Sequence, residues 1–222
     1  MGVVALLLAT FTALMVHNNV PTAVTEEDIT VFTSLGLERP QASRTFEEEI
    51  TLIRKVQHEV FKRVPLSDYG IPEYEHREPA DLMRFGKGLC FDRSRTFDKG
   101  FAYLGFPSRH VYLLYREGRS FSRAIFTYRQ PSHAVTEVKT SRGWMFVDSN
   151  YEWIALTSNG EPVGADDVWK RYAEFDNPPP YLAKPWWAIR GMYSRKGQFY
   201  GSGVPFPELN WADFADWLIR GE

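Results

Sequence analysis

The chain has one cysteine, Cys90, among its 222 residues. A single cysteine cannot form an intramolecular disulfide, so an exported form of the chain would rely on packing alone for its stability. One cysteine and scattered histidines also lack the spacing of a metal-ligand set, and we expect no metal and no cofactor. The thiol is therefore either part of the buried apolar core, as free cysteines commonly are, or a nucleophile.

An excess of positive charge is missing as well. Lys and Arg number 26 against 28 Asp and Glu, the formal net charge is −2, and no basic block is present. We therefore exclude nucleic acid as a partner. Internal repeats and low-complexity tracts are absent, while 44% hydrophobic residues, with 15% aromatic residues, provide ample material for a core. These features predict one globular domain with embellishments.

The longest uncharged apolar run covers residues 3–16 and is shorter than the ~20 residues that usually span a bilayer. It fits the apolar part of a signal peptide, although no Lys or Arg precedes it and no clean small-x-small cleavage site follows. A signal peptide, an uncleaved membrane anchor and an ordinary N-terminal helix remain open. We favour export or membrane anchoring in the cell envelope over a cytoplasmic location, with residues 1–20 as this segment.

Two helices are indicated before the middle of the chain. Thr45 and Glu48 form a capping box, and apolar residues follow at helical spacing, which predicts a helix from Thr45 to about Pro65. Residues 81–85 read as a helical turn. A second helix should begin at Cys90, with Ser94, Phe97, Phe101 and Leu104 on one face, and end at Gly105 and Pro107.

A β-rich block follows. The predicted strands are 111–115, 121–128, 132–140 and 144–148, with 154–157 as a further candidate, and turn residues separate them. We expect the four to be antiparallel. Residues 166–175 are predicted as a helix that the prolines of 178–180 end. We divide the chain into residues 1–20, a core domain at 24–175 and an aromatic-rich extension at 176–222 that packs on the core.

Cys90 has the surroundings of an activated thiol. A helix N-terminus favours thiolate over thiol, and Gly86 and Gly88 allow a sharp turn with room for a substrate. A thiolate nucleophile also needs a base and an acceptor that orients the base. His133 begins a predicted strand, and the hairpin around residues 141–143 brings Asp148 back beside it. The other histidines, at 17, 58, 76 and 110, are less suitably placed.

The order of these motifs closely resembles the transglutaminase-like superfamily. The resemblance rests on Gly88-Leu89-Cys90 before a helix, Gly105-Phe106-Pro107-Ser108-Arg109 before a strand, His133-Ala134-Val135-Thr136-Glu137-Val138, and Gly143-Trp144-Met145-Phe146-Val147-Asp148. It runs from about Phe46 to Asp148, nearly half of the chain. Ala134 and Val135, where the family often has an aromatic residue, and the lack of a proline after Asp148 separate the chain from the best-studied branches.

The resemblance implies an α+β fold with a papain-like or transglutaminase-like core, in which the nucleophile helix packs on an antiparallel sheet. It implies Cys90 as nucleophile, His133 as base and later acid, and Asp148 as the residue that holds the imidazole. The expected activity is cysteine-dependent acyl transfer or amide hydrolysis through a Cys90 thioester, on a peptide or protein substrate. Hydrolysis is preferred over crosslinking.

Two alternatives stay open. One is an acyltransferase similar to the arylamine N-acetyltransferases, which share the Cys-His-Asp order, and the other is a non-catalytic binding or assembly module. The Cys90 backbone N–H is the natural first oxyanion donor, whereas Tyr74, Arg84 and Lys87 are candidates for the second.

Two further residues have a structural and a functional interpretation. Arg109 could bind a substrate carboxylate, but a structural ion pair is preferred, and Trp144 is expected in the core rather than in the cleft. The aromatic cluster near the C-terminus could act as a lid or a glycan platform, but packing over the sheet is preferred.

Overall fold

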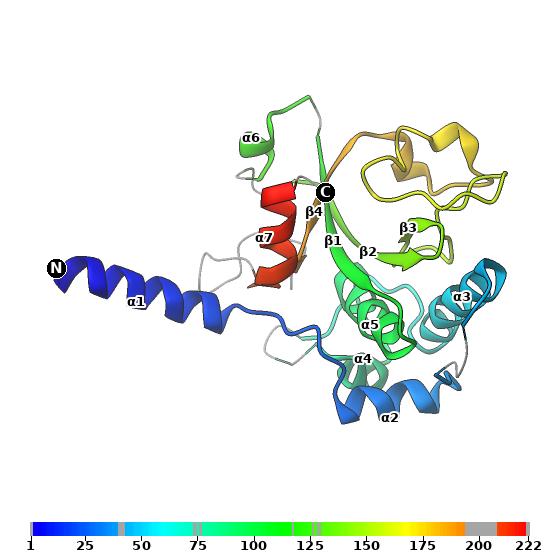
Figure 1. The fold of residues 1–222 in the computed structure, drawn as a ribbon, viewed down its shortest axis with the longest axis horizontal. Helices are drawn as coiled ribbons and strands as arrows, with labels where there is room; N and C mark the ends of the chain where they lie inside the picture. Colours follow the sequence, from blue (N-terminus) through cyan, green and yellow to red (C-terminus); the bar gives the residue numbers. More distant parts are fainter. Residues whose placement is uncertain are drawn as a thin grey trace.

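The computed structural model describes residues 2–39, 43–72, 75, 77–116, 118–125, 127, 130–193 and 208–220. Its helices are α1 (Gly2–His17), α2 (Glu26–Ser34), α3 (Phe46–Arg63), α4 (Pro79–Phe85), α5 (Cys90–Tyr103), α6 (Phe121–Ile125) and α7 (Trp211–Arg220), with 3-10 turns η1 (Tyr172–Glu174) and η2 (Pro180–Ala183) (Figure 1). The strands are β1 (Ser108–Tyr115), β2 (Ser132–Thr140), β3 (Gly143–Val147), β4 (Trp186–Arg190), β5 (Met192–Tyr193) and β6 (Glu208–Leu209). Among the residues discussed above, Tyr74, His76 and part of the aromatic extension lie outside these ranges.

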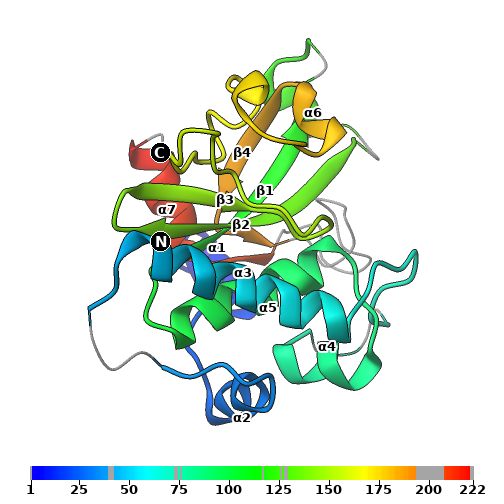
Figure 2. The ribbon, with the colours of Figure 1, turned by 90° about the vertical axis from the view of Figure 1, so that its right-hand side faces the viewer.

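The fold is α+β, as expected, with a four-stranded antiparallel sheet in the order β3-β2-β1-β4. Figure 2 shows α3, α4 and α5 stacked together against one side of this sheet. The core between the layers joins apolar residues of α3 and α5 to Val138, Met145 and Val147 of the sheet. The sheet and the helix that begins at Cys90 are therefore fixed relative to each other by a shared core.

The prediction of α3 is confirmed down to its cap. The Thr45 backbone N–H donates to Glu48 Oε2 at 2.7 Å, and the Glu48 N–H donates to Thr45 Oγ1 at 3.3 Å. The five apolar residues expected on its inner face, Phe46, Ile50, Ile53, Val56 and Val60, are all buried. The helical turn expected at 81–85 is the end of α4, and the second predicted helix begins at Cys90.

The predicted strand at 121–128 is wrong. Residues Phe121–Ile125 form the short helix α6, whose Ala124 is buried and whose Phe121 packs against Trp187 and Trp217. These aromatic contacts come from distant parts of the chain, and such tertiary packing overrides a local preference for strand. The fourth strand of the sheet is instead β4, which pairs with β1 from Val111↔Arg190 to Tyr115↔Trp186.

The expected extension at 176–222 therefore includes a strand of the main sheet. The strand β1 pairs with β2 on one side and with β4 on the other. A division at residue 175 therefore assigns the two neighbours of β1 to different parts of the chain. The predicted helix at 166–175 is also wrong, because only Tyr172–Glu174 forms a 3-10 turn there. Backbone pairing explains this: Thr157 forms a β-bridge with Phe175, and the Ser158 N–H donates to Glu174 O at 3.1 Å.

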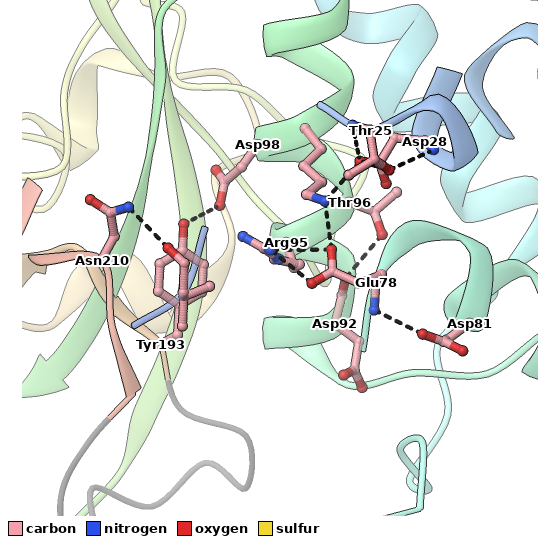
Figure 3. Close-up of polar contacts among 12 residues, drawn as sticks. Thr25, Asp28, Glu78, Asp81, Asp92, Arg95, Thr96, Asp98, Tyr193 and Asn210 are labelled. Carbon is pink, nitrogen blue, oxygen red and sulfur yellow. Dashed lines mark hydrogen bonds and ion pairs between the residues drawn. The ribbon is translucent and has the colours of Figure 1, made fainter. Parts of the chain in front are cut away.

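The helix α5 is buried on its polar side as well as on its apolar side. Asp92, Arg93, Arg95, Asp98 and Lys99 are all buried. Ion pairs compensate for this burial, as Figure 3 shows for Arg95 and Glu78, which lie 2.8 Å apart. A buried charge requires such a partner, so these contacts tie α5 to the surrounding helices.

Two further ion pairs join α5 to different parts of the chain. Arg77, in the segment just before α4, has its Nη1 atom 2.7 Å from Asp92 Oδ1 of α5. Lys99 of α5 has its Nζ atom 2.7 Å from Asp28 Oδ2 of α2. The position of Cys90 at the head of α5 is therefore set from several sides. In the described part of the chain, no helix is long and apolar enough to cross a membrane.

Gly88, between α4 and α5, has no room for a side chain. A Cβ atom there would lie 2.4 Å from Leu82 Cδ1 and 3.0 Å from Asp92 Cβ. We expect Gly88→Ala to lower the free energy of unfolding by about 1–3 kcal/mol through overpacking, as measured by urea denaturation. The neighbouring exposed Lys87→Ala should change it by less than about 0.5 kcal/mol. Unfolding of Gly88→Ala at the wild-type midpoint would contradict this account.

Candidate active site

Cys90 is the first residue of α5 and follows soon after α4, which ends at the left-handed Gly86 (φ 60°). The Leu89 backbone N–H donates to Asp92 Oδ2 at 2.9 Å, which fixes the entry of the chain into the helix. The first N–H groups of a helix have no acceptor within the helix, and they create a positive potential around Cys90. The thiol itself is partly buried, as its place on the apolar face of α5 predicts.

His133 and Asp148 meet at the open end of the β2–β3 hairpin. His133 pairs with Leu113 in the sheet, and Asp148 follows the last residue of β3. The His133 Nε2 atom lies 3.1 Å from Asp148 Oδ1, and both side chains are buried. The Cys90 thiol is within hydrogen-bonding reach of the same imidazole. The three side chains predicted to meet are therefore in contact in the order Cys90, His133, Asp148.

The charges of these groups favour an ion pair between thiolate and imidazolium. Burial alone would raise the pKa of the Cys90 thiol, but the hydrogen bond and charge of His133 lower this pKa below its usual value. Burial opposes the charged imidazole, yet the Asp148 carboxylate and Cys90 raise the pKa of His133 to about 10. The thiol and the imidazole interact directly, so both pKa shifts describe the pair. Such a thiolate is the reactive form of a cysteine.

Asp148 accepts several hydrogen bonds besides that of His133. The backbone N–H groups of Asn150 and Tyr151 donate to its Oδ1 atom at 2.7 and 3.1 Å. The Tyr181 hydroxyl donates to Oδ2, and its ring lies edge-on to His133 with centroids 5.0 Å apart. Burial and the neighbouring carboxylate raise the pKa of Tyr181 well above its usual value, so this hydroxyl keeps its proton.

Tyr181 is a residue that sequence reasoning missed. It lies 33 positions after Asp148, in η2, and the prolines before it signal only a chain turn. The residue reaches Asp148 because β4, which follows η2, joins the sheet beside β1. No local pattern indicates this contact.

Arg93 connects the loop before Cys90 to the loop after Asp148. Its Nη1 atom donates to Gly88 O at 2.6 Å, its Nε atom to Ser149 O at 2.5 Å and its Nη2 atom to Asn150 Oδ1 at 2.6 Å. The guanidinium is buried, and its charge also contributes to lowering the pKa of Cys90. The sequence signal for this role is that Arg93 follows Cys90 by three residues, about one helical turn, so the two residues lie on the same side of the helix.

Gln57 of α3 supports the same loop from the other side. Its side-chain Nε2 atom donates to Asp148 O at 2.8 Å and to Trp153 O at 2.9 Å. Gln57 is almost fully buried, so these contacts also satisfy a polar group that water does not reach. The loop carrying Asp148 is thus held by α3, α5 and η2.

A groove of about 570 Å³ leads to Cys90. Its lining consists of Leu66, Ser67, Asp68, Tyr69, Leu89, Cys90, Phe91, Arg93 and Asn150. Leu66 and Tyr69 are exposed apolar side chains, and the partly buried thiol lies at the wall of the groove. The thiol is therefore reached through a groove rather than from open surface.

The remaining candidates have structural partners. Arg109 Nε lies 2.7 Å from the buried Glu137 Oε2, which confirms the ion pair, and its guanidinium covers the half-buried ring of Trp144. Arg84 pairs with Glu75 and Asp81. Neither Arg84 nor Lys87 is among the described residues that line the groove.

Two of the other histidines, His58 and His110, have carboxylate partners. His58 is exposed and lies 2.8 Å from Glu152, and His110 is buried against Asp98. Among the residues that the structure describes, no group of three or more His, Cys, Asp and Glu side chains is placed to hold a metal ion.

Comparisons with known proteins find one family model and a distantly similar structure. A family model described as the transglutaminase-like superfamily matches residues 40–149, a range that includes Cys90, His133 and Asp148. A solved structure from Cytophaga hutchinsonii, described as a "Putative Cysteine Protease", is similar with a TM-score of 0.41 and 12% sequence identity. That match covers 84% of this chain and 60% of the other. A search of curated proteins finds no match.

The Tyr181 hydroxyl can be tested by its removal. We expect Tyr181→Phe to leave a buried carboxylate oxygen without its donor and to lower the free energy of unfolding by about 1–3 kcal/mol. Urea denaturation measures this change. Tyr151→Phe is the matched control, because the Tyr151 side chain is exposed and should change stability by less than about 0.5 kcal/mol. Equal stability of both variants would show that the Tyr181 contact contributes nothing.

The pH dependence of thiol alkylation tests the ion pair. Because the pKa of Cys90 is lowered, iodoacetamide should modify it rapidly at neutral pH and lose rate as the pH falls through that lowered pKa. Asp148→Asn removes the charge that raises the pKa of His133, so the midpoint should move up toward the ordinary thiol value of about 8.5.

Mass spectrometry of the Cys90 adduct at a series of pH values gives both profiles. Asp68→Asn serves as the control, since Asp68 is an exposed carboxylate of the same groove and should move the midpoint far less. A wild-type midpoint at the ordinary thiol pKa would rule out the ion pair.

Proposed function

Because residues 40–149 belong to the transglutaminase-like superfamily, we propose that this protein is a cysteine-dependent acyl-transfer enzyme, with hydrolysis of a peptide or isopeptide amide as its main reaction. The observation that carries the proposal is the contact of one imidazole with both Cys90 and Asp148, together with the opposite pKa shifts of Cys90 and His133. A pair of this kind supplies a nucleophile and a proton donor at the same time.

The reaction proceeds in two halves. The Cys90 thiolate attacks the carbonyl carbon of the amide and forms a tetrahedral intermediate. This intermediate collapses when the His133 imidazolium gives its proton to the leaving amine, and a thioester remains on Cys90. Water then attacks the thioester while neutral His133 takes a proton from it, and release of the carboxylic acid restores the thiolate and the imidazolium.

Asp148 acts by holding the imidazole. Its carboxylate lies against Nε2, which leaves the Nδ1 side of the ring for Cys90 and stabilises the charged form during both halves. The negative oxygen of the tetrahedral intermediate forms next to the N-terminus of α5, where the Cys90 backbone N–H is its first donor. The buried charge of Arg93, close enough to affect the pKa of Cys90, adds to the positive potential there.

The groove supports a polymeric substrate. With a volume of about 570 Å³ and walls that include the exposed Leu66 and Tyr69, it suits an extended segment of peptide chain. Hydrolysis needs only a water molecule as second substrate, whereas crosslinking needs room for an amine-bearing acceptor as well. We therefore retain hydrolysis as the preferred outcome.

Substitutions at the triad test the proposal. A library of quenched fluorescent peptides reports hydrolysis by wild type, Cys90→Ala and His133→Ala. We expect Cys90→Ala to be inactive and His133→Ala to lower kcat/KM by about 10²- to 10⁴-fold. His58→Ala is the matched control, because His58 is exposed, pairs with Glu152 and is not among the described residues that line the groove, so it should retain full activity.

Adducts on the thiol distinguish the alternatives. Intact-mass measurement should find a peptidyl thioester on Cys90 when the reaction is quenched in acid. An acetyl adduct formed from acetyl-CoA, with no peptide hydrolysis, would instead support an arylamine N-acetyltransferase-like enzyme. If a thiol probe labels His133→Ala at the wild-type rate, the catalytic proposal is wrong and the binding-module alternative is favoured.

A further inference from the structure

The large apolar side chains that remain exposed in the described residues fall into two places. Leu66 and Tyr69 line the groove, and Tyr151 follows Asn150 of the groove. The others, Leu6, Phe11, Val16, Leu218 and Ile219, lie on α1 and α7. The second set has no part in the proposed chemistry. We propose that α7 and α1 together form a membrane-contacting surface whose partner is the apolar interior of a phospholipid bilayer.

The described side chains of α1 are exposed except that of Met15, which is half-buried next to α7. Figure 1 shows it extending away from the rest of the molecule. Each residue from Ala9 to Ala13 is exposed, and five successive residues cover more than one full turn of a helix. No charged residue occurs at positions 2–16. A groove on a protein covers one face of a bound helix, whereas lipid surrounds a helix completely. A bilayer is therefore the partner that matches α1.

The length of α1 sets how it enters the bilayer. Its 16 residues give a helix about 24 Å long, and the hydrocarbon core is about 30 Å thick. The helix enters the apolar layer without crossing it. The polar residues His17, Asn18 and Asn19 follow directly. The part of the protein next to these residues must then lie at the membrane surface.

The helix α7 is the part of the protein that lies next to the end of α1. The Trp211 Nε1–H group donates to Met15 O at 2.8 Å, which joins the start of α7 to the end of α1. The connecting backbones are paired as well, since the Val20 N–H donates to Leu209 O at 2.8 Å. An indole at this junction matches the preference of tryptophan for the membrane interface.

A second apolar face of α7 is turned outward. Ala212, Ala215 and Ile219 recur at steps of three and four and are all exposed, with Leu218 beside them. Leu218 is 61% and Ile219 84% exposed. The helix therefore presents a stripe of these apolar side chains to solvent beside the ion pair of Asp216 and Arg220, next to the base of α1.

The seating of α7 prevents the stripe from turning inward. Its other face packs on the sheet through Phe214 and Trp217, and Trp217 contacts Phe121 at 5.8 Å between ring centroids. A Cβ atom at Gly191 would lie 2.6 Å from Phe214 N, which shows how closely α7 approaches the chain beneath it. The outward stripe is thus a fixed surface and can be covered only from outside.

The single cysteine makes a site-specific test direct. Ile219→Cys in a Cys90→Ala background places one label, an environment-sensitive nitrobenzoxadiazole dye, on the stripe of the full-length chain. With phosphatidylcholine vesicles, we expect its emission to shift to the blue and to be quenched by lipids that carry a nitroxide on the acyl chain. Tyr69→Cys in the same background is the matched control, because Tyr69 is also exposed but lies in the groove.

Flotation with the same vesicles tests α1. Wild type and Cys90→Ala should float equally, and Leu6→Lys with Phe11→Lys should lower the bound fraction about tenfold or more. These measurements do not depend on catalysis, so their outcome is independent of the proposed reaction.

Three results would overturn the proposal: no flotation of wild type, an equal emission shift at positions 219 and 69, or an emission shift at position 219 that needs no vesicles and grows with protein concentration. The last result would identify a second copy of the chain as the partner.

Discussion

The buried carboxylate of Asp148 is the group around which this structure is arranged. A fully buried negative charge is unfavourable unless donors surround it, and here two side-chain donors come from distant parts of the chain while two backbone donors lie in the adjoining loop. His133 comes from β2, Tyr181 from η2, and two backbone N–H groups from the loop that follows β3. Each donor requires a different element to be in place. The charge that holds the imidazole thus also makes the site depend on the completed fold.

The opposite half of the site depends on α5 in a similar way. The helix lies within the molecule with charged residues buried on one side and aromatic residues on the other. Arg93 links its first turn to the Asp148 loop, while Arg95 and Lys99 pair with Glu78. Each of these contacts requires its α5 side chain to point toward one particular partner. Together they therefore set the rotation of α5 about its axis. That rotation decides where the Cys90 thiol points.

The exposed surface of the protein has two regions with different physical character. The groove beside Cys90 combines exposed apolar side chains with polar groups and a reactive thiol, as a substrate site does. On the other surface, α1 carries no charge over residues 2–16, and α7 exposes apolar side chains beside the ion pair of Asp216 and Arg220. The second surface lies beside α6 and β4, away from the helices that carry Cys90 (Figures 1 and 2).

Much of this could be predicted from the sequence, because the signals are local. The capping box at Thr45 and Glu48, the apolar spacing after Cys90 and the hairpin between 132 and 148 each lie within a few turns of chain. A hairpin closed by a short turn brings its ends together without help from the rest of the fold. For this reason His133 and Asp148 could be placed beside each other from the hairpin, whereas Cys90 reaches them only because α5 packs on the sheet.

Long-range contacts were decided only by the tertiary structure. The residues 121–128 have strand composition, yet aromatic packing against Trp187 and Trp217 makes Phe121–Ile125 a helix, and the edge strand comes from residues 186–190. Tyr181, Arg93 and Gln57 acquire their roles through partners 33 to 96 positions away, and such pairings have no local pattern. The sequence by itself determined which groups could do the chemistry and where the regular elements begin. The fold decided which distant groups hold them in place, because burial and partner geometry arise only when the layers pack.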